Sequence, residues 1–186
     1  MDWSVAVICG AAGVGKSRLA AALADRHGVP LTASDDIVTA LMAVTSGAVL
    51  PALHRWEDDP ATHIWPPDRI AALHLAAAHE LRAAFAAVVA DHVAYRQRVV
   101  LEGDHLLPGL AGGPVRAVLL DEPDPAQLQA NMVARDDPHA AARAAVSTAV
   151  ARELRVLAAG CGVPVVAARP YASTLDRVER ALRSRG

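Results

Sequence analysis

Short apolar runs alternate with longer helical stretches along this chain. Five runs have the length and the β-branched content of buried strands, and they span residues 4–9, 29–33, 98–102, 115–121 and 163–168. Strands that are separated by helices pair in parallel, and the helices then cover both faces of the sheet. The pattern therefore predicts an α/β fold of three layers with a five-stranded parallel sheet in the middle.

The longest helical stretch runs from Asp68 to about Arg96. Its apolar face is made of residues at three- and four-residue spacing, namely Leu73, Ala77, Leu81, Phe85 and Val88 or Val89. Pro66 and Pro67 suit the start of this helix, because proline is tolerated in a first helical turn. A shorter stretch from Thr174 to about Arg183 predicts a C-terminal helix.

The length of 186 residues suits a single domain, 1–186. A formal net charge of −2 gives no electrostatic reason to expect nucleic acid as a partner. No apolar run approaches the length of a membrane span, and the first strand leaves no room for a signal peptide. Cys9 and Cys161 show no metal-binding spacing and are expected to be small buried residues, which favours a cytoplasmic location.

The sharpest motif lies between the first strand and a helix. The segment Gly10-Ala-Ala-Gly-Val-Gly-Lys-Ser17 fits the pattern G-x-x-x-x-G-K-[ST] of a phosphate-binding loop, or P-loop. We expect the nucleotide to contact this loop and the residue after it: Gly10, Ala11, Ala12, Gly13, Val14, Gly15, Lys16, Ser17 and Arg18. With the five strands, the motif predicts a three-layer P-loop NTPase fold; the alternative is an ordinary glycine-rich turn.

Lys16 is the only lysine in the chain, and all other basic side chains are arginines. A slim ammonium can reach β- and γ-phosphates as a point charge, whereas a planar guanidinium does so less well. Backbone N–H groups and the start of the following helix add positive potential. The Ser17 hydroxyl is placed for Mg²⁺. The expected ligands are therefore ATP or another nucleoside triphosphate, together with Mg²⁺.

Acidic residues follow the second and third strands, at the sheet edge where ligands bind in this class of fold. Asp35 is a candidate to accept a proton from an attacking hydroxyl, although Asp36 is not excluded. Both aspartates could instead favour the positive end of a helix. Glu102 could hold water on Mg²⁺, and Gly103 could let the backbone pass close to a ligand; the alternative is a solvated turn.

Two further segments carry candidate nucleotide contacts. Residues 135–143 interrupt two helical stretches, and this predicts a small helical lid whose Arg135 and Arg143 neutralise the migrating phosphoryl group. Both arginines could equally be solvated surface charges. After the last strand, Arg169 and Tyr171 could stack on the nucleotide base or form a polar turn.

An insertion at about residues 48–68 holds two of the three tryptophans and several prolines. We expect it to be irregular and either to contact the substrate or to be a surface excursion. The candidates for a substrate pocket, besides Asp35 and Arg143, are Arg55, Trp56, Trp65 and His105.

Residues 99–109, Val-Val-Leu-Glu-Gly-Asp-His-Leu-Leu-Pro-Gly, resemble the E-G-V-H-L-x-P-G segment of 2-phosphoglycerate kinases. Residues 34–37 and 48–54 are also similar to that family in order and spacing. The resemblance implies an ATP-dependent P-loop kinase of a small acid. Asp104 stands where that family usually has valine, and the lid spacing differs, which puts the substrate in doubt. Asp35 also resembles the base of chloramphenicol phosphotransferases and zeta-toxin-like kinases.

The sequence therefore favours a phosphotransferase that moves the γ-phosphate of ATP to a hydroxyl of a small molecule, in the manner of 2-phosphoglycerate kinases. An antibiotic or nucleoside O-phosphotransferase is the first alternative. A non-kinase P-loop ATPase is an alternative of another class, and a polynucleotide 5′-hydroxyl kinase fits the charge less well. Whether the chain forms a homodimer is left open.

Overall fold

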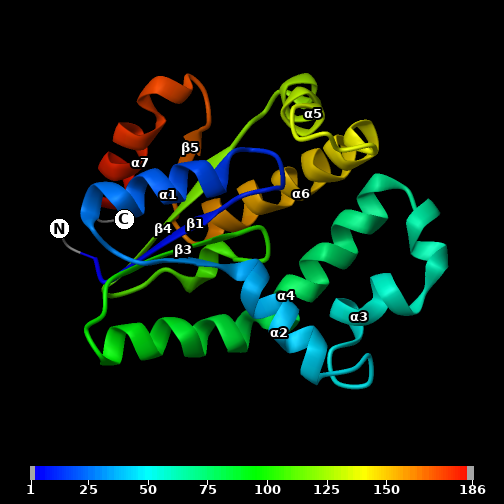
Figure 1. Ribbon diagram of the computed structural model, residues 1–186, viewed down its shortest axis with the longest axis horizontal. Coiled ribbons are helices and arrows are strands. Elements are labelled where there is room, and N and C mark those ends of the chain that lie inside the picture. The colour runs from blue at the N-terminus through cyan, green and yellow to red at the C-terminus, as the bar shows by residue number, and fades with distance from the viewer. Residues whose placement is uncertain (1–2, 184–186) are drawn as a thin grey trace.

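A five-stranded parallel sheet forms the centre of the protein, in a computed structural model that describes residues 3–183 (Figure 1). The strands are β1 (Val5–Cys9), β2 (Leu31–Ala33), β3 (Val99–Gly103), β4 (Val115–Asp121) and β5 (Val165–Ala167). Their order in the sheet is β2-β3-β1-β4-β5, and every neighbouring pair is parallel. The predicted strands and their parallel pairing are confirmed.

Strand β1 lies in the middle of the sheet and is buried along its whole length. Val5 is in register with Val99 of β3 on one side and with Val115 of β4 on the other. A central parallel strand has both faces covered by helices, so it must be apolar at every position rather than at alternate ones. This explains why the N-terminal apolar run is uninterrupted.

Helices cover both faces of the sheet and give the three layers (Figure 1). Helices α1 (Lys16–His27) and α7 (Thr174–Arg183) pack together on one face. Helices α4 (Pro67–Ala94) and α6 (Ala140–Gly160) pack together on the other. The bounds of α4 and α7 agree with the predicted helices to within two residues. The site is framed by the remaining helices, α2 (Ser34–Val44), α3 (Pro51–Asp58) and α5 (Pro125–Val133).

Helix α4 is long and apolar enough to cross a membrane by length and composition alone, a property that we did not expect from the sequence. One side of it carries buried residues, among them Leu81 and Phe85, and it packs against α3, α6 and β1. This side of the helix therefore contributes to the core, although only 28% of its apolar 18-residue window is buried.

The insertion at about 48–68 is not irregular, as we had expected, but mostly helical. It contains α3 and the 3₁₀ helix η1 (Pro60–Ile64). The carboxylate of Glu80 on α4 accepts hydrogen bonds from the backbone N–H groups of Ala52 (3.0 Å) and Leu53 (3.1 Å). These bonds satisfy the first free donors of α3 and fix it against α4. The carboxylate that caps α3 comes from α4, so the sequence of the insertion alone did not reveal that the insertion is helical.

Two shorter 3₁₀ helices, η2 (Pro108–Leu110) and η3 (Tyr171–Ser173), follow β3 and β5. Cys9 is buried as predicted, but Cys161 is exposed, which corrects the expectation that both are buried. Cys161 directly follows the last residue of α6, in the turn before β5.

Candidate active site

The P-loop lies at the carboxyl end of β1, where glycines allow backbone angles that other residues rarely adopt. Gly13 and Gly15 have φ values of 83° and 95°. A Cβ atom on Gly13 would also lie 2.9 Å from the Cε atom of Met132. Helix α1 starts directly after Gly15 and has no side-chain cap, so its first N–H groups are free to bind an anion.

Lys16 is buried at the start of α1, and its Nζ atom donates a 2.9 Å hydrogen bond to the carbonyl of Ala11. Burial lowers the pKa of Lys16, and the charges of Asp104, Glu102 and Asp35 oppose this shift. The lysine is therefore surrounded by three carboxylates at the mouth of the loop.

A cleft of about 340 Å³ opens in front of the P-loop. It is lined on one side by Lys16, Ser17 and their loop, and on the other by Asp35, Glu102, Asp104, Arg135 and Arg143. The structure thus brings together the residues that the sequence assigned to phosphate, metal and proton transfer. We call this space the phosphate cleft.

Glu102 and Ser17 form the candidate metal site. Glu102 is the fourth residue of β3 and is only 7% exposed. Burial raises the pKa of Glu102, and a hydrogen bond with the Ser17 side chain and the charge of Lys16 lower it in part. A carboxylate next to a P-loop hydroxyl is the donor set that Mg²⁺ takes beside substrate phosphates, so these residues fit the ion.

Asp35 and Asp36 are both exposed in the first turn of α2, but only Asp35 lines the phosphate cleft. The Ser34 hydroxyl donates a 3.3 Å hydrogen bond to the Asp35 carboxylate. Ser34 also explains Gly103, because a Cβ atom on Gly103 would overlap the Ser34 side chain. Gly103 therefore makes room for the start of α2, and it also lines the phosphate cleft, where we expected the backbone to pass close to a ligand.

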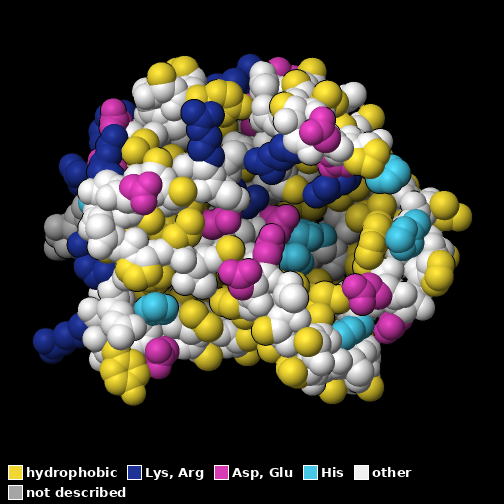
Figure 2. All heavy atoms as spheres, viewed as in Figure 1, with side chains coloured by type: hydrophobic (Ala, Val, Ile, Leu, Met, Phe, Trp, Pro, Cys, Tyr) yellow, Lys and Arg dark blue, Asp and Glu magenta, His cyan; other side chains and the backbone are white. Residues whose placement is uncertain are grey.

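A larger cavity of about 630 Å³ adjoins the phosphate cleft. Helices α3, α4 and α6 supply most of its wall, with Leu53, His74 and Val146 among the contributing residues. Figure 2 shows this face hollowed, with histidine and charged side chains around the opening. The two spaces share the lining residues Ala12, Asp104 and Arg143. We call the larger space the acceptor cavity.

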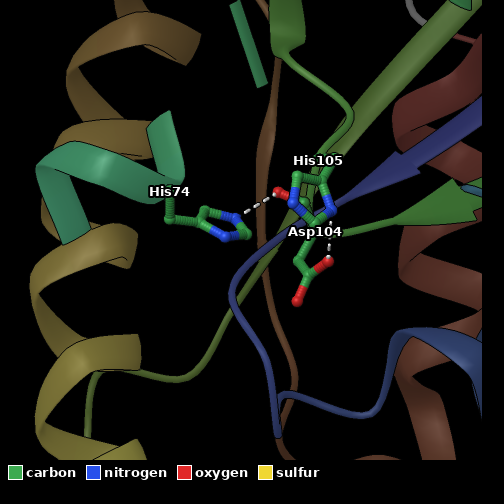
Figure 3. A group of neighbouring side chains, drawn as sticks. All are labelled: His74, Asp104 and His105. Carbon is green, nitrogen blue, oxygen red and sulfur yellow. Dashed lines mark hydrogen bonds and ion pairs between the residues drawn. The ribbon is translucent and has the colours of Figure 1, made fainter. Parts of the chain in front are cut away.

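His74, Asp104 and His105 meet where the two spaces join (Figure 3). His74 Nε2 lies 3.0 Å from the backbone oxygen of Asp104, and His105 Nδ1 lies 3.3 Å from its carboxylate. Burial would raise the pKa of Asp104, but the His105 ring, Lys16 and His74 together bring it below its usual value. The three side chains offer donor atoms within 4.8 Å of one another, a set that could hold a cation.

The predicted lid, residues 135–143, forms the turn between α5 and α6 and the first turn of α6. Asp137 orders this turn, because its carboxylate accepts hydrogen bonds from the His139 N–H (2.9 Å) and from Arg143 Nη1 (2.7 Å). Arg135 and Arg143 both line the phosphate cleft, and His139 lines the acceptor cavity.

Among the candidate substrate residues, Trp56, His105 and Arg143 line the acceptor cavity. Arg55 and Trp65 do not, which departs from our expectation. Arg55 is paired with Asp59 at 2.7 Å, and Trp65 is covered by the guanidinium of Arg69, 3.6 Å from its ring centroid. Arg55 is thus paired within the insertion, and Trp65 is held against the start of α4.

The residues predicted to hold the base, Arg169 and Tyr171, line neither space. Arg169 makes a bidentate ion pair with the buried Glu122, at 2.7 and 2.9 Å. Tyr171 is 46% exposed, and its hydroxyl bonds to Asn131, whose amide also donates to the carbonyl of Gly13. Arg169 is thus held by Glu122, while Tyr171 is linked to the P-loop through Asn131. Arg18 is exposed outside the phosphate cleft.

Sequence reasoning did not find the roles of His74, Asn131 and Met132 in this region. His74 and Met132 look like ordinary positions of helices, and Asn131 sits in a helix without a motif around it. Nothing local signals that these helices face the P-loop, so only the tertiary structure could reveal them.

Comparison with known proteins supports the same architecture. Residues 5–160 match the family model described as AAA domain. A gluconokinase from Sinorhizobium meliloti superposes with a TM-score of 0.54 at 20% identity, covering 97% of this chain and 91% of that one. An uncharacterized protein from Eubacterium ventriosum superposes with a TM-score of 0.53 at 9% identity over 100% of both chains. No curated protein matches the sequence. The fold is that of a P-loop NTPase, and the chain belongs to the AAA domain family.

Proposed function

We propose that this protein is a small-molecule kinase that moves the γ-phosphate of ATP to a hydroxyl group, with Mg²⁺ as cofactor. One observation carries the proposal: the phosphate cleft and the acceptor cavity share Ala12, Asp104 and Arg143. A phosphate held on the P-loop would lie at the boundary of a second, organic-sized cavity. A plain ATPase needs no such cavity, and the likeness to a gluconokinase supports the same conclusion.

The chain's own residues divide the work of phosphoryl transfer. Lys16 and the N–H groups of the P-loop would bind the β- and γ-phosphates. Ser17 and Glu102 would hold Mg²⁺, which when bound neutralises phosphate charge as the transfer proceeds. Arg135 and Arg143 would add positive charge from the lid. Because these groups surround one cleft, they can position ATP without large movements of the sheet.

We assign the acceptor's proton to Asp35. Lys16, His105 and His74 hold Asp104 in its ionised form, so Asp104 is a poor base but a good hydrogen-bond acceptor. Asp35 has only the Ser34 hydroxyl as a hydrogen-bond partner among the described residues. In the reaction the acceptor oxygen bonds to the γ-phosphorus, the bond from that phosphorus to the β-phosphate oxygen breaks, ADP leaves, and the proton passes to Asp35.

The chemical identity of the acceptor is a separate question. A 2-phosphoglycerate-like acceptor and an antibiotic or nucleoside alcohol are the two candidates from the sequence. A cytoplasmic location, the lack of membrane and nucleic-acid partners and a homodimer also remain predictions.

The direct test incubates the protein with ATP labelled in its γ-phosphate and a panel of hydroxyl compounds. We expect label in a small organic product, and Asp35→Asn should lower turnover by about tenfold or more while ATP affinity is kept. Asp36→Asn is the matched control, because Asp36 is exposed outside the cleft. Release of free phosphate alone, with every acceptor, would point to a non-kinase ATPase.

A further inference from the structure

The acceptor cavity has the size of a site for a small organic molecule. Its volume of about 630 Å³ lies within the usual range for ligand pockets, which is roughly 300–1,000 Å³. Apolar side chains form most of the wall: Leu53, Ile70, Leu73, Ala77, Val146 and Val150. An acceptor that fills this space must bury much of its surface against hydrocarbon.

The charges in the cavity do not favour an anionic acceptor. Apart from histidines, the charged residues that line it are Asp104 and Arg143. Arg143 is already paired with Asp137 at 2.7 Å, and its side chain is 60% exposed. Burial is the main cause that lowers the pKa of His74, so this ring is mostly neutral near pH 7. A carboxylate or phosphate on the acceptor would therefore meet Asp104 without an unpaired cation among these lining residues, and burying it would be costly.

Two pairs of flat rings line the cavity. Trp56 stacks on His63, with ring centroids 4.6 Å apart and an interplanar angle of 31°. His74 stacks on His105 at 4.4 Å, next to Asp104 (Figure 3). Aromatic faces of this kind bind apolar or aromatic bodies in offset-stacked or edge-on contact. Asp104, at the junction with the phosphate cleft, can accept a hydrogen bond from a hydroxyl.

From these observations we propose that the phosphate acceptor is an uncharged, largely apolar alcohol, with an aromatic or aliphatic body in the cavity and its reacting hydroxyl at the junction with the phosphate cleft. The inference rests on the proposed kinase function and deepens it by naming the substrate class. It favours an alcohol of the antibiotic type over a phosphorylated sugar acid.

The test compares two probes of nearly equal shape. One is a phenylpropanediol, and the other is the matching hydroxy-phenylpropanoate, in which a carboxylate replaces one hydroxymethyl group. Binding to the intact protein is measured by calorimetry. We expect the diol to bind about tenfold tighter or more than the acid. Equal or tighter binding of the acid, or of 2-phosphoglycerate, would overturn the proposal.

A charge variant sharpens this comparison. Ala142 is exposed on α6 and lines the cavity, whereas the neighbouring Ala141 is exposed and does not. Ala142→Arg should improve binding of the acid relative to the diol by about fivefold or more, because it supplies the missing cation, and Ala141→Arg should leave the ratio unchanged. An equal change in both variants would contradict the proposed location of the acceptor.

Label transfer from ATP separates the two proposals. If the diol binds with the expected preference but no compound of the panel receives label, the kinase function is refuted and the cavity assignment stays in place. Label on the acid but not on the diol supports a kinase and refutes the acceptor class.

Discussion

Arg143 Nη1 lies 2.7 Å from the carboxylate of Asp137, and this ion pair ties the first turn of α6 to the turn before it. Arg143 lines both the phosphate cleft and the acceptor cavity. The pair therefore controls how much positive charge the lid offers to a ligand. A lid arginine that is already paired contributes less to phosphate binding than a free one.

Replacing Asp137 by Asn should test this relationship. The amide keeps an oxygen for the His139 N–H but removes the negative charge beside Arg143. The Arg143 side chain is 60% exposed, but that of Asp137 is only 10% exposed, so loss of the charge should lower stability by about 1–2 kcal/mol. The KM for ATP should fall about two- to fivefold at low salt, and the gain should shrink as salt screens the freed charge.

Asp136→Asn is the control for this experiment. Asp136 is exposed, lines neither space and has a φ of 55°, which asparagine tolerates as well as aspartate. Steady-state kinetics of the two variants give the comparison. An unchanged KM in Asp137→Asn would show that Arg143 does not face the nucleotide.

The close approach of Gly103 to Ser34 gives a prediction about stability. Gly103→Ala places a methyl group where the Ser34 side chain lies, and α2 must shift to relieve the overlap. We expect a loss of about 1–3 kcal/mol in the free energy of unfolding, measured in urea. Ser34→Gly in the same chain should recover part of the loss, because it removes the overlapping atoms. Additive effects of the two changes would contradict direct contact.

From the burial of Glu102 we expect the magnesium requirement to depend on pH. Burial raises the pKa of Glu102, so in the metal-free protein it takes up a proton at a higher pH than an ordinary glutamate does. Protons and Mg²⁺ then compete for the same carboxylate, and the Mg²⁺ concentration for half-maximal activity should rise as the pH falls below neutral. Glu102→Gln should raise this concentration about tenfold and remove the competition. A wild-type requirement that stays constant as the pH falls would argue against a metal role.

Much of the fold was predictable, because its signals are local. The buried strand before Gly10 and the helix after Lys16 are marked by residues next to the motif, and parallel pairing follows from the alternation of strands and helices. Asp35 and Glu102 were also accessible to sequence reasoning, since parallel strands end at one edge of the sheet.

The rest depended on pairings between distant segments. For Arg169 the sequence left stacking on the base and a polar turn open, because the carboxylate that holds it, Glu122, lies 47 positions earlier in the chain. The acceptor cavity is made by side chains of α3, α4 and α6 that show no common motif. Helix periodicity places Leu73 and Val146 on apolar helix faces, but it does not show that a cavity lies between these faces.

The two cysteines should differ sharply in reactivity. Cys9 is fully buried in the central strand, and its Sγ atom lies 3.3 Å from the carbonyl oxygen of Val118. Burial raises the pKa of the Cys9 thiol to about 12, although the charge of Lys16 opposes the shift, so almost no thiolate is present near neutral pH. Cys161 is exposed at the end of α6. A thiol reagent such as iodoacetamide should therefore modify Cys161 alone in the native protein and both cysteines in guanidinium chloride, as peptide mass spectrometry can show. Cys161→Ser should leave the native protein unlabelled, and rapid native labelling of Cys9 in that variant would mean that the strand beneath the P-loop opens readily, contrary to its complete burial.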